Sequence, residues 1–427
     1  MDNYIERFLE KDIKKWLGKP KILILKGARQ TGKTTLLKKI KSDLESKKQK
    51  TLFFSLDLEI NNPLFQDPKL LISFLKRKSQ EKFLYLFLDE FQYINQAGLF
   101  LKVIFDQLRD KIQIIASGSS SLEITKNTEF LTGRKIEFHL STLHFREFLA
   151  SSLPTNETFS WDNLEEIKDF DLIYREELKN NLADYVHFGS YPEVVITKEF
   201  KFKQILLREL ISSYLQKDIA GFLKIEKTRE FNNLSKILAD QIANLVNKNE
   251  LSNTVNLDNA TLSKYLSVLE NTYVFDFLNP YYQNIRKELS KMPKVFINDF
   301  GMRNVLLNKG SKKGLFYDEL KGEEIENFVY LELKQKVLGN LYFYRTISKA
   351  EIDFLISREE KFIPLEVKFR NKVNKNIPSV MKNFSSKYPV DYFLIITKDF
   401  LSINKKEKKV FLPVYLLAFW DFTLGEI

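Results

Sequence analysis

The stretch Lys21–Thr35, KILILKGARQTGKTT, decides the fold of the N-terminal part of the chain. Its beginning, Lys21–Leu25, is a short apolar run that predicts a buried strand, and the residues after Thr34 have the spacing of a helix. Between them, Gly27–Thr34 matches the pattern GxxxxGKT in the strand–loop–helix context that this pattern requires. Glycines let backbone N–H groups turn towards phosphate oxygens, and the N-terminus of the helix adds a positive dipole. The stretch therefore predicts a P-loop that binds nucleotide phosphates.

Two side chains of this loop have specific predicted roles. Lys33 is expected to reach the β- and γ-phosphates, and the Thr34 hydroxyl is expected to be a ligand of Mg²⁺. ATP and Mg²⁺ are thus the expected cofactors. The predicted nucleotide-binding set is the loop with the residue after it: Gly27, Ala28, Arg29, Gln30, Thr31, Gly32, Lys33, Thr34 and Thr35.

A second apolar run, Leu84–Leu88, predicts another buried strand and ends in Asp89-Glu90. Carboxylates at the C-terminal end of a parallel strand lie where ligands bind in open α/β sheets. We expect Asp89 to hold Mg²⁺ through water, and Glu90 to orient or deprotonate the attacking water. Because Glu90 points to hydrolysis rather than binding alone, the sequence predicts an ATPase.

Two more strand-like runs, Thr51–Leu56 and Ile112–Ala116, complete a βαβ series that predicts a parallel sheet with helices on both faces. The second run ends in Ser117, which we expect beside the γ-phosphate. Arg134 has two interpretations. It is either an arginine finger, which would require a homo-oligomer, or a surface arginine that pairs locally with Glu137.

The middle of the chain has helical patterns. Residues 151–230 predict a helical lid, with a plain structural linker as the alternative. In 231–310, the helices Leu234–Leu245 and Asp258–Glu270 and the strand Val274–Leu278 predict a winged helix, whose second helix would be the recognition element. That helix also has leucines at core spacing, so a spacer that contacts protein is the alternative. The candidate DNA contacts are Thr261, Ser263, Lys264 and Lys287.

Charged residues recur on two predicted strands near the C-terminus, Glu351–Ile356 and Phe362–Phe369. Positions two apart in a strand share a face, so Glu366 and Lys368 project together. If the strands are adjacent, Asp353 and Glu366 lie close enough to share a divalent metal, and oxygen ligands suit Mg²⁺ or Mn²⁺. An exposed strand face is the alternative interpretation of the same pattern.

Composition excludes several classes of protein. At 427 residues the chain predicts several domains. It has no cysteine, which excludes disulfides and thiolate metal sites, and its three histidines argue against a histidine-based zinc site. No apolar run of about 18 residues predicts a membrane span, so we expect a cytoplasmic protein without a membrane partner. The net charge of +11 is compatible with an acidic partner such as nucleic acid.

Motifs along most of the chain occur in a recognisable order: GARQTGKTTLL, FLDEFQ, ASGSSS, LTGRKIEFHLSTLHFREFL, Tyr185–Glu193, Tyr214–Asp218, Asn298–Gly301 and Glu366–Lys368. This order resembles a large group of bacterial and archaeal AAA-type ATPases whose C-terminal half is a domain of unknown function. The resemblance implies an AAA-type core over residues 1–150, followed by the lid. In related ATPases a Gly-x-Pro motif helps to hold the adenine, and the matching residues here are Ser190-Tyr191-Pro192. Pro192 is therefore expected to contact the base, with Ser190 in place of the usual glycine.

The strands near the C-terminus and the helix before them resemble the PD-(D/E)xK nuclease superfamily. This resemblance implies a restriction-endonuclease-like α/β domain over residues 311–427, with Asp353 and Glu366 as metal ligands. Lys368 would position or activate the attacking water, and Glu326 on the preceding helix would be an additional carboxylate. Ile352 stands where the superfamily often has proline.

Two functions are compatible with this reading. In the first, ATP gates a metal-dependent nuclease that acts on nucleic acid, with DNA as the expected partner. In the second, the chain is an ATP-dependent switch that does not cleave, and it binds DNA or a protein through its winged-helix and nuclease-like domains.

Overall fold

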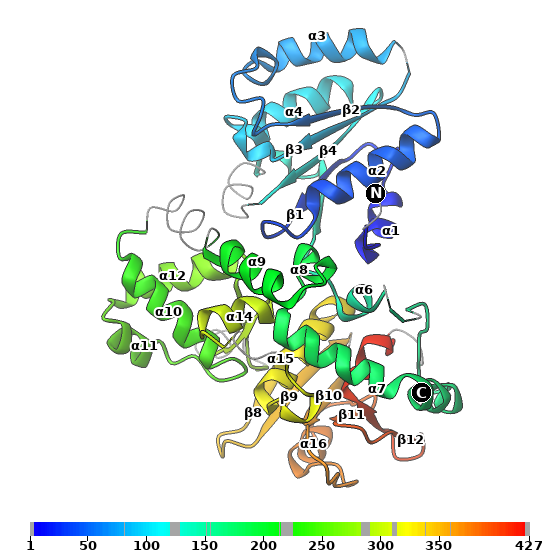
Figure 1. The fold of residues 1–427 in the computed structure, drawn as a ribbon, viewed down its shortest axis with the longest axis vertical. Helices are drawn as coiled ribbons and strands as arrows, with labels where there is room; N and C mark the ends of the chain where they lie inside the picture. The colour runs from blue at the N-terminus through cyan, green and yellow to red at the C-terminus, as the bar shows by residue number, and fades with distance from the viewer. Residues whose placement is uncertain are drawn as a thin grey trace. The chain divides into compact units, whose positions relative to one another are not determined.

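The computed structural model divides into two compact units (Figure 1). The first unit consists of Met1–Leu143, Tyr191–Ile196 and Asn271–Tyr273, and the second consists of the rest of the chain. Lys287, an expected DNA contact, lies outside the described residues. The structure describes residues 4–80, 82–119, 129–150, 152–153, 155–212, 214, 225–282, 291–309, 314–337, 339–358 and 360–422.

The first unit is built on a parallel sheet with the strand order β2-β3-β4-β1-β5. Every strand pairing recorded in this sheet is parallel, and the strand before the P-loop lies between β4 and β5. This confirms the predicted parallel α/β core. The strands are β1 (Ile22–Lys26), β2 (Lys50–Ser55), β3 (Leu84–Asp89), β4 (Ile112–Gly118) and β5 (Lys135–His139).

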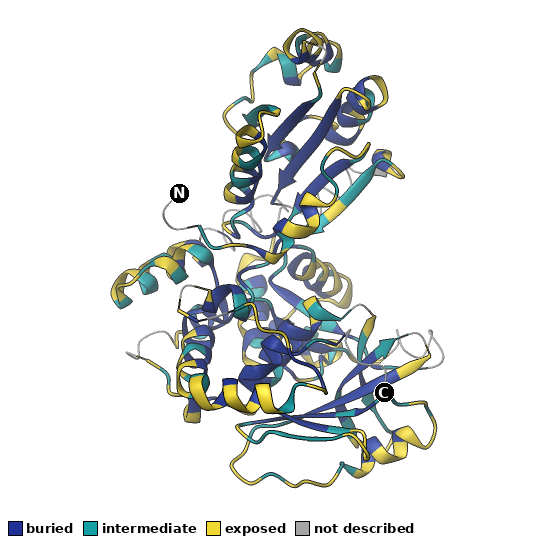
Figure 2. Cartoon of the chain, turned by 90° about the vertical axis from the view of Figure 1, so that its right-hand side faces the viewer, coloured by how far each residue is buried: buried dark blue, intermediate teal, exposed yellow. Residues whose placement is uncertain are grey.

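Helices cover both faces of this sheet, as Figure 1 shows. Alternate side chains of each strand point to opposite faces. Ile24 therefore joins a buried cluster with α3 and α4, whereas its neighbour Leu25 joins a cluster with α1 and α2. The sheet is buried throughout its central strands (Figure 2). The helices are α1 (Phe8–Lys14), α2 (Lys33–Ser46), α3 (Pro68–Ser79), α4 (Ala97–Leu108) and, later in the chain, α8 (Pro192–Ile196).

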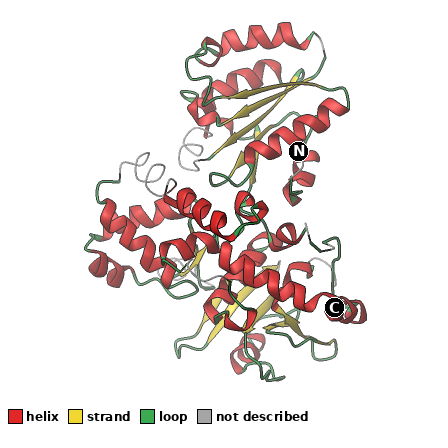
Figure 3. Cartoon of the chain, in the orientation of Figure 1, coloured by secondary structure: helices red, strands yellow, loops and turns green. Residues whose placement is uncertain are grey.

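The second unit contains a larger mixed sheet with the order β12-β13-β11-β10-β9-β8 (Figure 3). The predicted neighbours β9 and β10 pair antiparallel, and their register places Phe354 opposite Leu365. Asp353 and Glu366 are therefore next to each other across the two strands. The strands are β8 (Asn340–Arg345), β9 (Glu351–Arg358), β10 (Lys361–Lys368), β11 (Phe393–Thr397), β12 (Ser402–Asn404) and β13 (Lys409–Pro413).

Helices and a small antiparallel sheet precede and flank this mixed sheet. The order α10, α11, α12, β6, β7 is the one that a winged helix needs, and that assignment stays a prediction. The helix predicted for Leu234–Leu245 ends earlier, at Asp240, because Ala243 has a φ of +62° and its N–H is bonded to Val295 instead. No helix in the described ranges combines the length and apolar composition that crossing a membrane requires. These elements are α6 (Phe145–Leu149), α7 (Leu164–Phe188), α9 (Phe200–Ser212), α10 (Thr228–Asp240), α11 (Lys248–Val255), α12 (Asn259–Asn271), β6 (Phe275–Leu278), β7 (Lys294–Ile297), α14 (Phe300–Leu306), α15 (Gly322–Lys336) and α16 (Ser379–Ser385).

Strand β7 is fixed to α15 by a side chain rather than by another strand. Asn327 is fully buried, its Oδ1 accepts from the N–H of Ile297 at 2.8 Å, and its Nδ2 donates to the carbonyl of Ile297 at 3.0 Å. The amide thus satisfies both backbone groups of the residue that ends β7, as a neighbouring strand would.

Asn327→Leu should weaken the second unit, because it leaves the N–H and the carbonyl of Ile297 buried without partners, a loss of about 2–4 kcal/mol. Hydrogen–deuterium exchange at Ile297, together with the melting temperature of the full chain, measures the effect. Asn253→Leu on the exposed face of α11 is the matched control and should change neither. Unchanged protection at Ile297 in the Asn327 variant would contradict this account.

Candidate functional site

The predicted P-loop connects β1 to α2, and its glycines are required by its geometry. Gly32 is the N-cap of α2 with a φ of +94°, a conformation that side chains other than glycine rarely adopt. At Gly27 a Cβ atom would lie 2.2 Å from the carbonyl oxygen of Leu140, so the backbone passes too closely for any side chain. The loop thus opens the N-terminus of α2 to an anion.

Lys33, in the first turn of α2, is 4% exposed. Its ammonium donates to the carbonyls of Gly27 at 3.1 Å and Ala28 at 2.7 Å, so it lies along the inside of the loop. Burial lowers the pKa of Lys33 to about 8, although the charges of Glu90 and Asp89 act to raise it. The group is therefore a cation held at the point where phosphates would meet the loop.

Asp89 ends β3 and is bonded to two hydroxyl groups. Its Oδ2 accepts from the Thr34 hydroxyl at 2.6 Å, and its Oδ1 accepts from the hydroxyl of Ser117 at the end of β4. Ser117 was expected beside the γ-phosphate, but it is fully buried and its hydroxyl is directed to Asp89. The carboxyl group is therefore held next to the Thr34 hydroxyl, as a Mg²⁺ site with oxygen ligands requires.

Glu90 follows with a φ of +55°, which turns its side chain away from the strand direction. Its Oε2 accepts from Gln92 Nε2 at 2.5 Å and from the Ser119 hydroxyl at 3.1 Å. Gln92 is a functional residue that the sequence reasoning missed. The FLDEFQ motif contains it, but nothing in the spacing shows that a residue two positions on would fold back onto Glu90.

Lys33, Thr34 and Glu90 line a cavity of about 550 Å³ within the first unit. The predicted residues Arg29 to Thr35 line it together with Glu90 and Pro192. Tyr4, Ile5, Leu143 and Ile196 also line it and make part of its wall apolar. A cavity lined by both phosphate-binding groups and apolar side chains matches a nucleotide, whose base needs apolar contacts.

The N-terminal segment contributes to this cavity through Arg7, which the sequence reasoning also missed. Arg7 is 4% exposed, and its guanidinium donates to the carbonyl of Thr31 at 2.8 Å. It also donates to the carbonyls of Ser141 at 2.8 Å and Thr142 at 3.2 Å. The planar group thus ties the segment that contains Tyr4 and Ile5 to the P-loop.

Arg134 lies at the surface, outside the residues that line the cavity. It forms a two-point salt bridge with Asp106, with distances of 2.7 Å to Oδ1 and 3.1 Å to Oδ2. The predicted local partner, Glu137, is instead paired with Lys26 at 2.8 Å and with Lys135. The local pair therefore exists with a different carboxylate, and a role as arginine finger stays a prediction.

The carboxylates predicted in the C-terminal domain gather around a lysine that the sequence reasoning did not include. Lys294, the first residue of β7, is 2.7 Å from Glu326 Oε1 and 3.9 Å from Asp353 Oδ1. It also contacts Glu351 Oε1 at 2.5 Å. Burial acts to lower the pKa of Lys294, but these carboxylates outweigh it and raise the pKa above the ordinary value. Lys294 is therefore a protonated cation inside the cluster.

The remaining contacts leave few oxygens for a metal. Asp353 Oδ2 accepts from the N–H of Val367 at 2.8 Å, and Glu366 Oε1 is bonded to the predicted catalytic lysine, Lys368. Glu366 Oε2 is buried without a hydrogen-bond partner in the described part of the chain. Burial, and then the charge of Asp353, raises the pKa of Glu366 to about 7, so this oxygen is partly protonated near neutrality.

Among the described residues no group of three acidic or histidine side chains is arranged to hold a metal ion. The predicted metal set of Glu326, Asp353 and Glu366 stays a prediction, which this arrangement does not support. These residues do lie near one another, and one oxygen of each carboxylate is the partner of a lysine ammonium, at 3.9 Å in the case of Asp353. Of the neighbouring residues on β10, Glu366 is buried and Val367 is half-buried.

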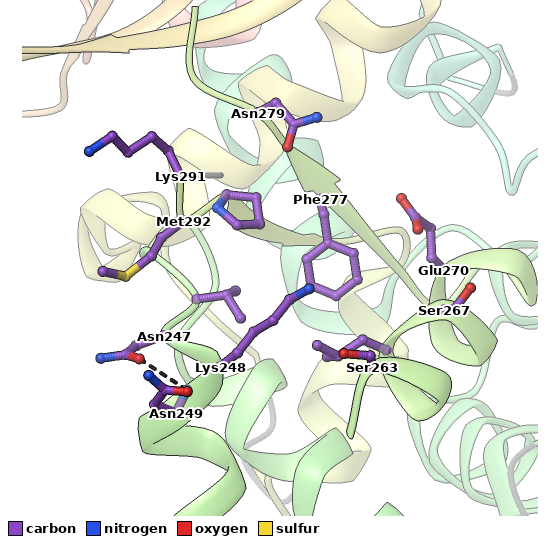
Figure 4. A pocket seen from close by; sticks show the side chains of 13 residues that line it. Asn247, Lys248, Asn249, Ser263, Ser267, Glu270, Phe277, Asn279, Lys291 and Met292 are labelled. Atoms are coloured by element: carbon purple, nitrogen blue, oxygen red, sulfur yellow. Dashed lines mark hydrogen bonds between the residues drawn. The ribbon is translucent and has the colours of Figure 1, made fainter. Parts of the chain in front are cut away.

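A second cavity of about 540 Å³ lies beside the predicted recognition helix α12 (Figure 4). Ser263, Ser267 and Glu270 of α12 face it, together with Lys248 of α11 and Phe277 of β6. Thr261 donates its hydroxyl at 2.6 Å to Asp258, which caps α12, and Lys264 is not among the residues that line the cavity. The contacts of Thr261, Ser263 and Lys264 with DNA stay predictions. The mixture of acidic, basic and apolar groups here does not select a ligand class.

Comparison with known proteins agrees with the nucleotide site. Residues 19–149 match the family described as AAA domain. Residues 179–313 and 321–417 match two families described as domains of unknown function (DUF8612 and DUF4143). The N-terminal part of the chain is therefore of the AAA-type P-loop ATPase class.

Similar proteins occur in bacteria and archaea. An uncharacterized protein of Haemophilus influenzae is 27% identical over 361 residues, which are 82% of each chain. An uncharacterized protein of Methanocaldococcus jannaschii is 26% identical over 385 residues, 86% of this chain and 79% of that protein. This chain is thus similar to these proteins over most of its length, beyond the AAA domain.

Solved structures are more distant. AMPPCP-bound DnaA from Aquifex aeolicus has a TM-score of 0.32 and 15% identity, covering 63% of this chain and 90% of that chain. The S. cerevisiae Hsp104:casein complex has a TM-score of 0.30 and 12% identity, covering 58% of this chain and 47% of that chain. Scores of this size do not support a statement about function.

The lowered pKa of Lys33 predicts that nucleotide affinity depends on pH. Phosphates need the ammonium form, and the free chain loses this proton near pH 8. Affinity for MgATP should therefore fall by up to about tenfold per pH unit between pH 8 and 10, because binding then requires proton uptake. Isothermal titration calorimetry measures both the affinity and the proton uptake. In Lys33→Arg, whose guanidinium stays charged, the dependence should be absent; a flat profile in the wild type would contradict the prediction.

Proposed function

We propose that this chain is a Mg²⁺-dependent ATPase that works as a nucleotide-controlled switch. One observation carries the ATPase part of the proposal: Glu90 lines the same cavity as Lys33 and Thr34, so a carboxylate that can act on water lies beside the phosphate-binding groups. The cavity has the size and the mixed polar and apolar lining that ATP needs.

Each residue of the site has a part in this mechanism. The backbone of the P-loop and Lys33 bind the phosphates, and Pro192 with the apolar part of the cavity wall holds the base. Thr34 and Asp89 would hold Mg²⁺, which supplies positive charge next to the transferred phosphoryl group. Glu90 orients water and takes up its proton, and Gln92 and Ser119 fix the carboxylate through hydrogen bonds to Oε2.

The ATPase proposal predicts different defects for two variants. Lys33→Ala should abolish ATP binding, because the loop loses its cation. Glu90→Gln should keep binding but lower turnover by at least about 100-fold, since the amide cannot accept a proton. Phosphate release and nucleotide binding are measured separately. Glu45→Gln, at the far end of α2, is the control and should retain both. Normal turnover in Glu90→Gln would show that another group activates the water.

The switch part of the proposal rests on the segment that leads into α8. Ser190 immediately precedes Tyr191 and Pro192, and it is bonded to the buried carboxylate of Asp299. Asp299 Oδ2 accepts from the backbone N–H of Ser190 at 2.7 Å and from its hydroxyl at 3.2 Å. Its other oxygen caps α14 by accepting from Met302 at 3.0 Å.

The segment before Pro192 can approach Asp299 closely because residue 189 is glycine. At Gly189, which has a φ of +75°, a Cβ atom would lie 2.3 Å from Asp299 Oδ1 and 2.5 Å from the nitrogen of Gly301. We therefore expect a nucleotide bound in the cavity next to Pro192 to shift the backbone at Ser190. Through the hydrogen bonds of Asp299, this shift would also displace β7 and α14. ATP binding would change the conformation of this region, and the chain would bind an acidic partner such as DNA, or a protein. The proposal does not include nucleic-acid cleavage, because lysine side chains are the partners of the C-terminal carboxylates.

Nucleotide binding should change hydrogen–deuterium exchange in residues 294–306, and Asp299→Asn should reduce this response while retaining ATP binding. The experiment uses the Glu90→Gln background to prevent turnover. Asp258→Asn is the matched control, since Asp258 also caps a helix, accepting from the N–H of Thr261 at 2.9 Å, but has no bond to Ser190. If ATP leaves hydrogen–deuterium exchange in residues 294–306 unchanged in the Glu90→Gln chain, the proposed switch is wrong. The proposed ATPase activity is not contradicted by that result.

A further inference from the structure

The acidic cluster of Glu326, Glu351, Asp353 and Glu366 contains the positively charged side chain of Lys294. The side chain of Lys294 is 3% exposed, and its Nζ lies 2.7 Å from Glu326 and 2.5 Å from Glu351. Arg345 adds a second positive charge, 3.6 Å from the other oxygen of Glu351. The carboxylates that sequence patterns assign to a metal are thus partners of basic side chains.

The fold fixes Lys294 in this position. β7 pairs with β6, and Lys294 lies opposite Leu278 in that pairing. At its other end β7 is bonded to α15 through Asn327, the residue after Glu326. Because the same helix carries Glu326 and holds the strand of Lys294, the ammonium and the carboxylate are set against each other by backbone contacts. The Lys294–Glu326 pair thus differs from a surface ion pair, in which two exposed side chains must both be ordered before they meet.

The basic side chains in the cluster argue against an added divalent cation. Four carboxylates, those of Glu326, Glu351, Asp353 and Glu366, are met by three basic groups, those of Lys294, Arg345 and Lys368. Mg²⁺ and Mn²⁺ need about six oxygen ligands, and a dication in this cluster would lie close to the ammonium of Lys294. Glu366 Oε2 is a buried oxygen without a partner among the described residues, but it belongs to the same cluster as the Lys294 ammonium, which is 2.7 Å from Glu326 and 2.5 Å from Glu351.

We infer that Lys294 is a built-in counter-ion that takes the place of a divalent metal in this cluster, so that the native chain binds no catalytic metal there. Removing the ammonium should free Glu326, Glu351 and Asp353 to bind one. The cluster then serves to join β7 to β9 and α15, and the chain does not cleave nucleic acid through it.

Mn²⁺ binding to the full-length chain without nucleotide tests this inference, measured by electron paramagnetic resonance of free Mn²⁺ and by calorimetry. The wild type should show no binding that depends on Asp353. Lys294→Met should gain one Mn²⁺ site, with an affinity for Mn²⁺ at least about tenfold higher than that of the wild-type cluster. Asp353→Asn in the Lys294→Met background should remove this site. Lys334→Met is the matched control, because Lys334 on α15 also pairs with a carboxylate, Asp276 at 2.5 Å, outside the cluster.

Each result decides the question. An Mn²⁺ site in the wild type that weakens in Asp353→Asn would overturn the inference, and so would a folded Lys294→Met that gains no site. If Lys294→Met does not fold, the wild type and its Asp353→Asn variant decide alone: a rise in melting temperature with Mn²⁺ that needs Asp353 overturns the inference, and no such rise supports it. Because nucleotide is absent, the ATPase proposal is unaffected by any of these outcomes.

Discussion

The buried carboxylate of Asp299 is the contact on which the organisation of the chain depends. Taking an ionised carboxylate out of water costs several kcal/mol unless hydrogen bonds replace the lost hydration. Here the N–H groups of Ser190 and Met302 and the Ser190 hydroxyl replace it. Burial nevertheless raises the pKa of Asp299 to about 6, while these hydrogen bonds lower it. The contact thus holds the end of α7 and the start of α14 together only in one geometry.

The same short segment, from Lys294 to Asp299, has contacts at both ends and in the middle. Lys294 is bonded to Glu326 in the acidic cluster, Ile297 is bonded to Asn327, and Asp299 is bonded to Ser190. A displacement at one of these points must be accommodated at the others, because a strand in a packed core moves as a unit. In the proposed switch, these contacts within the second unit are the ones that would connect Ser190 to β7.

The sequence predicted what is local and contiguous. The P-loop lies in one stretch, and its strand and helix follow from patterns of apolar residues, so its position and its lysine were predictable. Strand alternation also predicted correctly that Asp353 and Glu366 are neighbours. Patterns along the chain do not show which distant side chain meets a given group. Arg7 on the P-loop, Gln92 on Glu90 and Lys294 in the acidic cluster depend on tertiary packing, and each changes the chemistry of the residue it contacts.

The two carboxylate sites of the chain differ in the kind of partner that each carboxylate has. Asp89 and Glu90 accept from hydroxyl and amide groups, which are neutral, so their negative charge remains available to attract a cation. Glu326 and Glu366 are bonded to ammonium groups, which use that charge. Sequence motifs identify the acidic residues of both sites. They do not show which side chains are bonded to each carboxylate, and these side chains determine whether a metal ion can bind. In the functions proposed above, divalent metal chemistry therefore belongs to the nucleotide site, and the nuclease-like residues have a structural use.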